Sequence, residues 1–310
     1  MERDQTAPNR SPAIETAGLS KHFGQRRAVD ELTITIPAGT VAGFIGPNGS
    51  GKTTAIRLLL GLVRPTAGSA TVLGRPVTDP RSYLPRVGAL VEAPAFYPSM
   101  SGRTNLEVLA RLAGYSHARV DVVLELVELA DRARDRVGTY SLGMKQRLGV
   151  AMALLPDPDL LILDEPANGL DPPGIIATRD LLRRLRDEGK TVFLSSHLLG
   201  ELEQVADWLV MLHQGRALYD GPARAFLDQQ SVLVVETGHA AQLDVLARVA
   251  RAAGYTATVD HGSLTIAAPV DFSAELKRRA SAAGVVDVTI RARVATFEER
   301  FMALLQGEHR

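Results

Sequence analysis

The chain of 310 residues contains no cysteine. Disulfide bonds, thiolate nucleophiles and cysteine-ligated zinc are therefore excluded as sources of stability or chemistry. The sequence also lacks an excess of either charge, because its 35 basic and 35 acidic residues cancel. A protein that binds a nucleic-acid backbone usually carries a basic excess. This balance argues against nucleic acid as the main ligand.

Long apolar runs are missing as well. No segment approaches the roughly 18 consecutive apolar residues that predict a membrane-spanning helix. The longest candidate, 148-LGVAMALLP-156, is short and ends in proline. The opening MERDQTAPNRSP has no apolar core and does not resemble a secretory signal. We expect residues 1–12 to form a disordered leader and the protein to be cytoplasmic.

Short apolar strands alternate with helical patterns in the first two thirds of the chain. Strands are predicted at 31–37, 40–46, 160–164 and 191–196, and helices at 52–62 and 174–188, with a mostly helical stretch over 104–155. Continuous apolar strands separated by helices are typical of a largely parallel sheet that is covered on both faces. The fold class is therefore α/β, over residues 13–225.

The composition changes near 221-GPARAFLDQQ-230, which predicts a domain boundary. Beyond it the patterns predict strands at 231–237, 255–259, 263–268 and 285–290, and helices at 239–252, 272–283 and from 296 onward. Thr296 and Glu299 fit a capping box for the last helix. The order βαββαβ is that of a small α+β, ferredoxin-like module, here residues 230–310. Its sequence indicates no functional site.

A glycine-rich loop lies between a predicted strand and a predicted helix. The stretch 46-GPNGSGKT-53 matches the pattern G-x-x-x-x-G-K-[ST]. In this context, glycines allow successive amides to point at a phosphate at the positive end of the helix, which an incidental glycine turn would not explain. The Lys52 charge would bind the β- and γ-phosphates, and the Thr53 hydroxyl would bind Mg²⁺. The expected nucleotide-binding residues are Gly46, Pro47, Asn48, Gly49, Ser50, Gly51, Lys52, Thr53 and Thr54.

A second motif is the apolar strand 160-LLILDEP-166, which ends in two carboxylates. Ligands of a parallel sheet lie beyond the carboxyl ends of its strands, so Asp164 and Glu165 should arrive beside the phosphate loop. We expect Asp164 to hold Mg²⁺ and Glu165 to be the general base for an attacking water. Many strands end in a charged turn, and it is the pairing with the phosphate loop that makes this motif specific.

The third motif, 140-YSLGMKQRLGVA-151, precedes the acidic strand. With these motifs in this order, residues 14 to about 220 resemble the ATP-binding cassette (ABC) family, specifically the nucleotide-binding subunit of a transporter. The resemblance implies a P-loop NTPase with a mostly parallel sheet, an antiparallel β part and a helical subdomain at about 95–155. Ser141 should cap a helix, and Ser141 and Gly143 would contact the γ-phosphate bound by the other subunit. Leu142 stands where the family's most familiar form has glycine.

The same resemblance assigns further residues. His197 would contact the γ-phosphate, Asp171 would join the two sites across the dimer, and Phe23 would stack on adenine. Glu92, in 87-VGALVEAPAFYP-98, stands where the family normally has a glutamine that reaches Mg²⁺ and the attacking water. Exporters related to bacitracin and lantibiotic resistance share this glutamate. Mg²⁺ and Lys52 would have to offset its charge.

An apolar patch, Phe96, Tyr97 and Met100, follows Glu92 and would fit a groove for a helix of the membrane subunit. The leading hypothesis is therefore an ATPase that powers export of a drug, antimicrobial peptide or related amphiphile through separate transmembrane permease subunits. It would act as a homodimer, or paired with a related ATPase subunit, peripherally at the cytoplasmic face of the membrane. The motif style and the appended C-terminal module resemble bacterial exporters of the drug and peptide-antibiotic type, and an importer is the alternative.

The alternative is a soluble ABC-type ATPase that acts on nucleic acid or the ribosome. Repair and chromosome relatives usually separate the motifs by a coiled coil or a zinc insertion, and translation factors usually carry two cassettes with a basic linker. The sequence contains none of these features.

Overall fold

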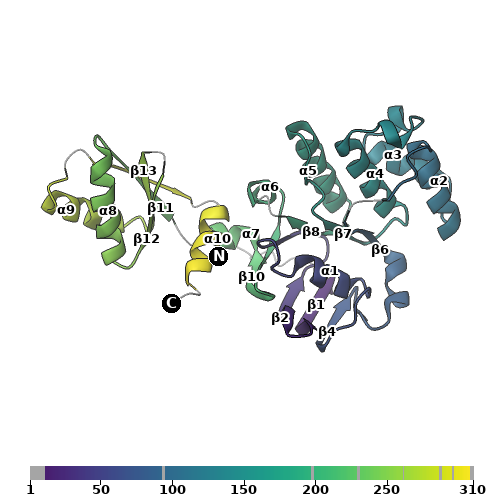
Figure 1. The fold of residues 1–310 in the computed structure, drawn as a ribbon, viewed down its shortest axis with the longest axis horizontal. Coiled ribbons are helices and arrows are strands. Elements are labelled where there is room, and N and C mark those ends of the chain that lie inside the picture. The colour runs from purple at the N-terminus through teal and green to yellow at the C-terminus, as the bar shows by residue number, and fades with distance from the viewer. Residues whose placement is uncertain are drawn as a thin grey trace, which may run out of the picture. The chain divides into compact units, whose positions relative to one another are not determined.

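The computed structural model describes residues 11–92, 95–196, 199–228, 231–260, 262–285, 288–294 and 297–307 (Figure 1). Most of the expected leader, residues 1–10, lies outside this described part. The chain divides into two compact units, Met1–Pro222 and Ala223–Arg310. The division falls inside the segment whose change of composition predicted a boundary.

An antiparallel sheet forms one part of the first unit, with the strand order β2-β1-β4-β5. In β2, Leu32, Ile34 and Ile36 are buried while the residues between them are exposed, because successive side chains of a strand point to opposite faces. The polar and apolar alternation of the sequence therefore specifies which face packs on the core. The strands are β1 (Ile14–Phe23), β2 (Arg26–Ile36), β4 (Ala67–Val72) and β5 (Arg75–Pro76).

A mostly parallel sheet forms the centre of this unit, in the order β10-β9-β3-β8-β7-β6. Every residue of β3, β7 and β8 is buried, as expected for strands covered on both faces. The rings of Phe44 and Phe193 pack at 5.1 Å between centroids. The strands are β3 (Val41–Ile45), β6 (Val87–Leu90), β7 (Leu160–Asp164), β8 (Thr191–Ser196), β9 (Trp208–His213) and the antiparallel edge strand β10 (Arg216–Pro222).

Helices lie around this sheet and in a group beside it (Figure 1). The expected helical stretch over 104–155 consists of separate helices, α2, α3 and α4, which contact one another. Ser101 caps the start of α2, and Gly114 in the left-handed conformation ends it. The helices are α1 (Lys52–Leu59), α2 (Gly102–Ala113), α3 (Ala118–Leu126), α4 (Leu142–Leu154), α5 (Pro172–Asp187) and α6 (Leu199–Glu203), with 3₁₀ turns η1 (Pro80–Ser82), η2 (Leu84–Arg86), η3 (Ala130–Arg132) and η4 (Val137–Thr139).

The second unit is an antiparallel sheet in the order β12-β13-β11-β14, which α8 and α9 cover on one face (Figure 1). Its elements follow the order βαββαβ, and Leu233, Leu246, Ile266 and Leu276 lie in its core. The elements are α7 (Ala223–Asp228), β11 (Ser231–Thr237), α8 (Ala240–Ala252), β12 (Thr256–Asp260), β13 (Ser263–Ala267), α9 (Phe272–Ala282), β14 (Val288–Val294) and α10 (Phe297–Gly307).

The expectation that a strand begins at residue 285 is wrong, because this residue belongs to the end of α9. Gly284 takes a φ of 77°, and the Val285 amide donates to the Ala280 carbonyl at 2.9 Å. This is the backbone pattern of a glycine-terminated helix, whose last apolar residue folds back on the helix. Thr296, expected to cap the last helix, lies outside the described residues.

In the part of the chain that the structure describes, no helix combines the length and the apolar character needed to cross a membrane. A cluster of buried apolar residues joins the two sheets of the first unit through α1.

We expect Phe193→Ala to lower the free energy of unfolding of the first unit by about 3–5 kcal/mol, because it leaves a cavity beside Phe44. Ile176→Ala, at an exposed position of α5, is the control and should change it by about 0.5 kcal/mol or less. Urea unfolding measures both changes. Because the protein has two units, the unfolding curves are fitted with more than one transition if different spectroscopic probes give different midpoints. Equal losses for the two variants would contradict this placement of the core.

Candidate active site

The loop between β3 and α1 has a backbone that only glycine can adopt at its key positions. Gly49 and Gly51 have φ values of 80° and 112°. A Cβ at Gly46 would lie 2.4 Å from the Leu212 carbonyl oxygen, and one at Gly51 would lie 2.2 Å from that of Ala28. Both approaches are sterically impossible. The loop is thus closely packed against the neighbouring strands, and its shape is set before any ligand binds.

Lys52 is the first residue of α1 and folds back over this loop. Its Nζ donates to the carbonyls of Gly46 at 2.6 Å and Pro47 at 3.4 Å, and it lies 3.9 Å from Glu165 Oε1. Burial lowers the pKa of Lys52, and the nearby carboxylates of Glu165 and Asp164 partly oppose this. A cation held in this way costs desolvation energy in the protein alone and favours an anion as its additional partner.

Ser50, in the same loop, provides a second indication of a polar ligand. Its Oγ is buried and has no hydrogen-bond partner among the described residues. Buried hydroxyls are rarely left without a partner, because the loss of hydration is costly. The loop therefore offers glycine-shaped backbone, a buried cation and a free hydroxyl within one short segment, which fits the phosphates of a nucleotide.

The Asp164 carboxylate joins three elements. One oxygen accepts from Thr53 Oγ1 of α1 at 2.9 Å, and the other accepts from Ser195 Oγ of β8. Ser195 is fully buried and is paired with Asp164 in the parallel register of β7 and β8. Its hydroxyl also accepts from the Glu165 amide at 2.9 Å. Ser195 therefore fixes the carboxylate of Asp164 and the backbone amide of Glu165. The sequence motifs did not indicate this role.

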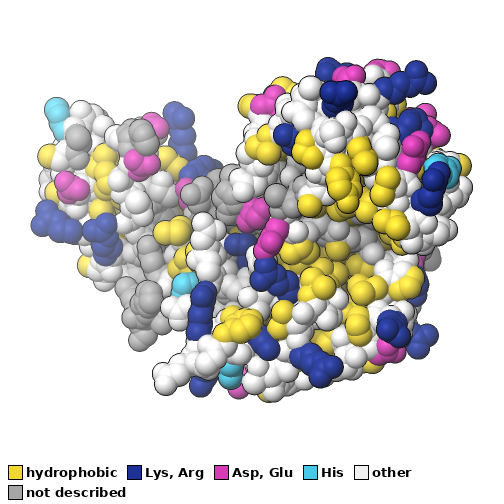
Figure 2. Space-filling view, turned by 45° about the vertical axis from the view of Figure 1, so that its right-hand side comes forward, with side chains coloured by type: hydrophobic (Ala, Val, Ile, Leu, Met, Phe, Trp, Pro, Cys, Tyr) yellow, Lys and Arg dark blue, Asp and Glu magenta, His cyan; other side chains and the backbone are white. Residues whose placement is uncertain are grey.

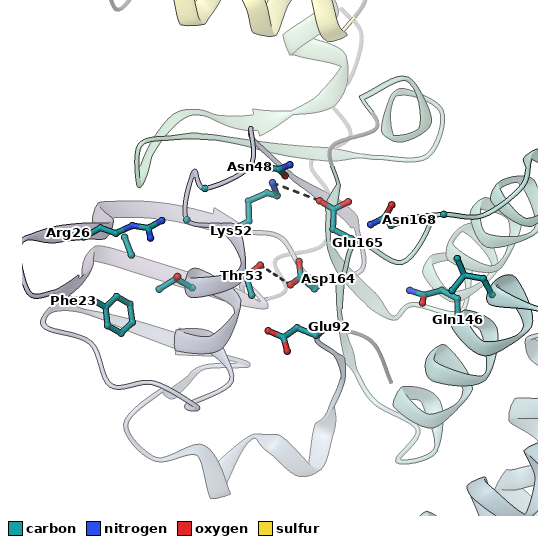
Figure 3. A pocket seen from close by; sticks show the side chains of 16 residues that line it. Phe23, Arg26, Asn48, Lys52, Thr53, Glu92, Gln146, Asp164, Glu165 and Asn168 are labelled. Atoms are coloured by element: carbon teal, nitrogen blue, oxygen red, sulfur yellow. Dashed lines mark hydrogen bonds and ion pairs between the residues drawn. The ribbon is translucent and has the colours of Figure 1, made fainter. Parts of the chain in front are cut away.

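A pocket of about 630 Å³ opens in front of these residues (Figure 3). Lys52 and Thr53 of α1 face Asp164 and Glu165 at the end of β7, while Gln146 of α4 lies on the opposite side. The lining comprises Phe23, Arg26, Ala28, Asn48, Gly49, Gly51, Lys52, Thr53, Thr54, Glu92, Leu142, Gln146, Asp164, Glu165, Asn168 and Gly169. Most of the predicted site residues therefore meet in one cavity, although they come from distant parts of the sequence.

Some predicted residues do not line this cavity. Gly46, Pro47 and Ser50 belong to the loop but are not among the lining residues, and neither are Ser141, Gly143 and Asp171. Ser141 caps α4 by accepting from the Met144 amide at 3.2 Å, as expected. His197 lies outside the described residues.

Asp171 caps α5 by accepting from the Gly174 amide at 3.2 Å. Leu142, the departure from the usual glycine, lies against Gly169, where a Cβ would approach its Cδ2 to 2.7 Å. The left-handed φ of 74° at Gly169 and this close contact together require glycine. The loop after Glu165 is thereby packed against the start of α4.

Phe23 and Arg26 form the margin of the pocket at the turn between β1 and β2 (Figure 3). Phe23 is 52% exposed, although it is a large aromatic residue. Lys21 Nζ lies 5.1 Å from its ring centroid. An exposed ring beside a phosphate-binding loop fits a flat heterocycle, and Arg26 was not indicated by any motif.

Glu92 follows β6 with a φ of 64°, in the left-handed region that glutamate rarely adopts. It lines the pocket with Asp164 and Glu165, and its carboxylate forms an ion pair with Arg57 of α1. Arg57 is a cation beside Glu92 that no sequence motif indicated, while Lys52, expected to offset this charge together with Mg²⁺, lies 3.9 Å from Glu165. Arg57 is one helical turn after Thr53, a spacing from which its position on this face could have been inferred.

The fold and the site together define a P-loop nucleotide hydrolase. The ABC transporter family model matches residues 29–168. The bacitracin transport ATP-binding protein BcrA of Bacillus licheniformis is 45% identical over 215 residues, which cover 68% of this chain and 70% of that protein. The lantibiotic transport ATP-binding protein SrtF of Streptococcus pyogenes is 39% identical over 67% of this chain and 92% of its own.

A solved structure of the ATP-binding subunit of an ABC transporter matches with a TM-score of 0.63 and 29% identity, over 70% of this chain and 92% of that one. The chain belongs to the ABC transporter family, as one of its ATP-binding ATPases. The residues that the family model matches lie in the first unit, where the pocket also lies.

We expect Ser195→Ala to lower ATP hydrolysis by about 10–100-fold, because Asp164 and the Glu165 amide both lose a buried partner. The same change should lower the free energy of unfolding by about 1–3 kcal/mol. Steady-state phosphate release and chemical unfolding measure the two effects. Ser82→Ala removes an exposed hydroxyl that bonds only locally to Asp79 and is the control. Full activity of Ser195→Ala would contradict its role in holding the acidic residues.

Proposed function

We propose that this protein is the ATP-hydrolysing subunit of an exporter that moves a drug, an antimicrobial peptide or a related amphiphile through separate transmembrane permease subunits. The observation that carries this proposal is the pocket in which the phosphate loop, Asp164 and Glu165 meet beside Glu92. The names of the bacitracin and lantibiotic transport relatives support the class of cargo.

ATP is the substrate in this proposal, and different residues of the pocket would contact its phosphates and its adenine. The amides of the loop, together with Lys52, hold the phosphates at the N-terminus of α1. Phe23 supplies an exposed ring on which the adenine can stack. Arg26, at the same margin, adds a positive charge near the nucleotide.

Thr53 and Asp164 would hold Mg²⁺, since their oxygens already face each other at 2.9 Å. Among the described residues, no cluster of His, Cys, Asp or Glu could enclose a metal ion by itself. Mg²⁺ suits such a site because it is usually bound by one or two protein oxygens together with substrate phosphates and water. When bound, it would neutralise negative charge on the phosphates.

Glu165 would act as the general base that takes a proton from the attacking water. Its side chain is 23% exposed and therefore reachable from the pocket, while its amide is held by Ser195. Lys52 Nζ lies 3.9 Å from its Oε1. Glu92, on the neighbouring strand end, would orient the water from the opposite side of Thr53 and contribute to the Mg²⁺ site.

The complete site would need a second subunit, either another copy or a related ATPase. Ser141, Gly143 and Asp171 are not among the residues that line the cavity of their own chain, which suits residues that serve the partner's nucleotide. Ser141 is an exposed helix cap, and the Leu142 and Gly143 amides at the start of α4 would be available to an anion. His197 would contact the γ-phosphate of its own site.

Docking on a permease would hold the chain at the cytoplasmic face of the membrane. Tyr97 is 61% exposed and Met100 is 36% exposed, directly after the Glu92 loop, and Phe96 is half-buried beside them. This arrangement links the nucleotide site to an apolar surface. On the face shown in Figure 2, basic side chains are interspersed with acidic ones, which does not favour the alternative of a nucleic-acid partner.

We expect Glu165→Gln to keep ATP binding and to lower hydrolysis by about 100-fold or more, because the amide cannot accept the proton. In the host that encodes the chain, deletion should increase sensitivity to the exported compound, tested with bacitracin and a lantibiotic. The wild-type gene should restore resistance, and the Glu165→Gln gene should not. Recovery of the tagged protein only from soluble ribosome or DNA fractions would contradict the transporter function.

We also expect Phe96→Ala and Tyr97→Ala to lower recovery of the tagged chain with host membranes more than they lower ATP binding. Both changes remove apolar surface from the proposed docking patch, and the Tyr97 ring is exposed enough to be removed without disturbing the core. Leu62→Ala, at another exposed apolar position, is the control and should leave membrane recovery unchanged. Loss of ATP binding with intact membrane recovery would contradict the docking role.

A further inference from the structure

Arg57 and Glu92 form an ion pair at the edge of the nucleotide pocket. Arg57 lies on α1, one turn beyond Thr53, and its carbonyl accepts from the Leu62 amide at 2.9 Å, which ties the end of that helix to the following turn. Glu92 comes from the separate segment that follows β6. The pair therefore joins the helix that begins at the phosphate loop to the segment that leads to the proposed docking patch.

The charges of the pocket explain why this pair matters. Three carboxylates line the cavity: Glu92, Asp164 and Glu165. Lys52 lies between the last two, with its Nζ 3.9 Å from Glu165, and Asp164 is also held by two hydroxyl donors. The polyphosphate of ATP would bring further negative charge into this space. A third carboxylate without its own cation would repel that charge, because like charges in a partly enclosed site are costly.

The pair contributes little to folding. The side chains of Arg57 and Glu92 are 41% and 63% exposed, and ion pairs at such positions hardly stabilise a fold. The backbone of Glu92 is moreover held in a left-handed conformation with a φ of 64°, which disfavours rather than favours the folded chain. The ion pair contributes little to stability, and the backbone of Glu92 is strained. Such a contact at the edge of a ligand pocket indicates a role in ligand binding rather than in folding.

We propose that Arg57 is a positioning residue of the ATP site: it neutralises and orients the Glu92 carboxylate, so that a glutamate can line the pocket without repelling the phosphates. The proposal rests on the ATP-binding function proposed above. A glutamine at position 92 would carry no charge and would not need Arg57 for this purpose. The two positions are therefore energetically coupled, and the coupling appears in ATP affinity.

A double-mutant cycle of Arg57→Gln and Glu92→Gln tests this coupling. The affinity for ATP is measured on the full-length protein by calorimetric titration in EDTA, so that bound Mg²⁺ cannot mask the repulsion. We expect Arg57→Gln to weaken ATP binding about tenfold when Glu92 is present. In the Glu92→Gln background, the same change should alter the affinity by about twofold or less. The tenfold loss should shrink as salt is raised, because salt screens exposed charges.

Two further variants separate charge from structure. Arg57→Lys retains the positive charge and should keep ATP affinity within about threefold of the wild type. Arg86→Gln breaks a comparably exposed ion pair, with Asp159, that lies outside the pocket, and it should leave ATP affinity unchanged. Thermal unfolding of each variant checks that the fold is intact, and the Tm of Arg57→Gln should match that of Arg86→Gln.

Equal losses from Arg57→Gln in the two backgrounds would overturn the proposal, and so would an equal loss from Arg57→Lys. A wild-type protein that fails to bind ATP at all would instead overturn the proposed function. A wild-type protein that binds ATP without any coupling between positions 57 and 92 would remove only the role assigned to Arg57.

Discussion

Asp164 accepts hydrogen bonds from Thr53 at 2.9 Å and from Ser195, and the rest of the site depends on these contacts. They connect the helix after the phosphate loop to the ends of two adjacent parallel strands. Because β3, β7 and β8 run in the same direction, their carboxyl ends meet at one edge of the sheet. The phosphate loop, the oxygens of Thr53 and Asp164, and Glu165 are thus brought together by strand pairing rather than by closeness in the sequence.

The same pairing explains the two glutamates with left-handed backbone. β6 and β7 are parallel, and the last paired residues are Leu90 and Leu163. Glu92 and Glu165 each stand two residues beyond them, with φ values of 64° and 52°. Each backbone turns sharply where its strand ends, which directs the side chain into the pocket. This conformation costs of the order of 1 kcal/mol for a residue with a Cβ and is retained at positions where function requires it.

Two short segments of the chain connect the nucleotide pocket to the protein surface. The Glu92 segment leads from the pocket to the half-buried Phe96 and the exposed Tyr97, and the loop after Glu165 packs against Leu142 at the start of α4. Both links begin at a carboxylate of the pocket. The pocket is thus connected through the chain to the docking patch and to the start of α4 that were proposed above as partner-facing surfaces. The second unit has a core of its own and contributes none of the residues that line this pocket.

Local motifs were enough to predict the phosphate loop, the acidic strand end, the helix cap at Ser141 and the α/β class, because each depends on a few neighbouring residues and on the period of apolar side chains. The ferredoxin-like order of the second unit was predicted in the same way, although Val285 belongs to the cap that follows α9 and the last strand, expected at 285–290, is described over Val288–Val294. Ser195, Arg57, Arg26 and Gln146 were not predicted. Their positions beside the pocket follow from strand register and helix packing, which join residues as much as 111 positions apart, as Thr53 and Asp164 are. By itself the sequence determined which chemistry is present, and only the tertiary structure decided which charges face each other.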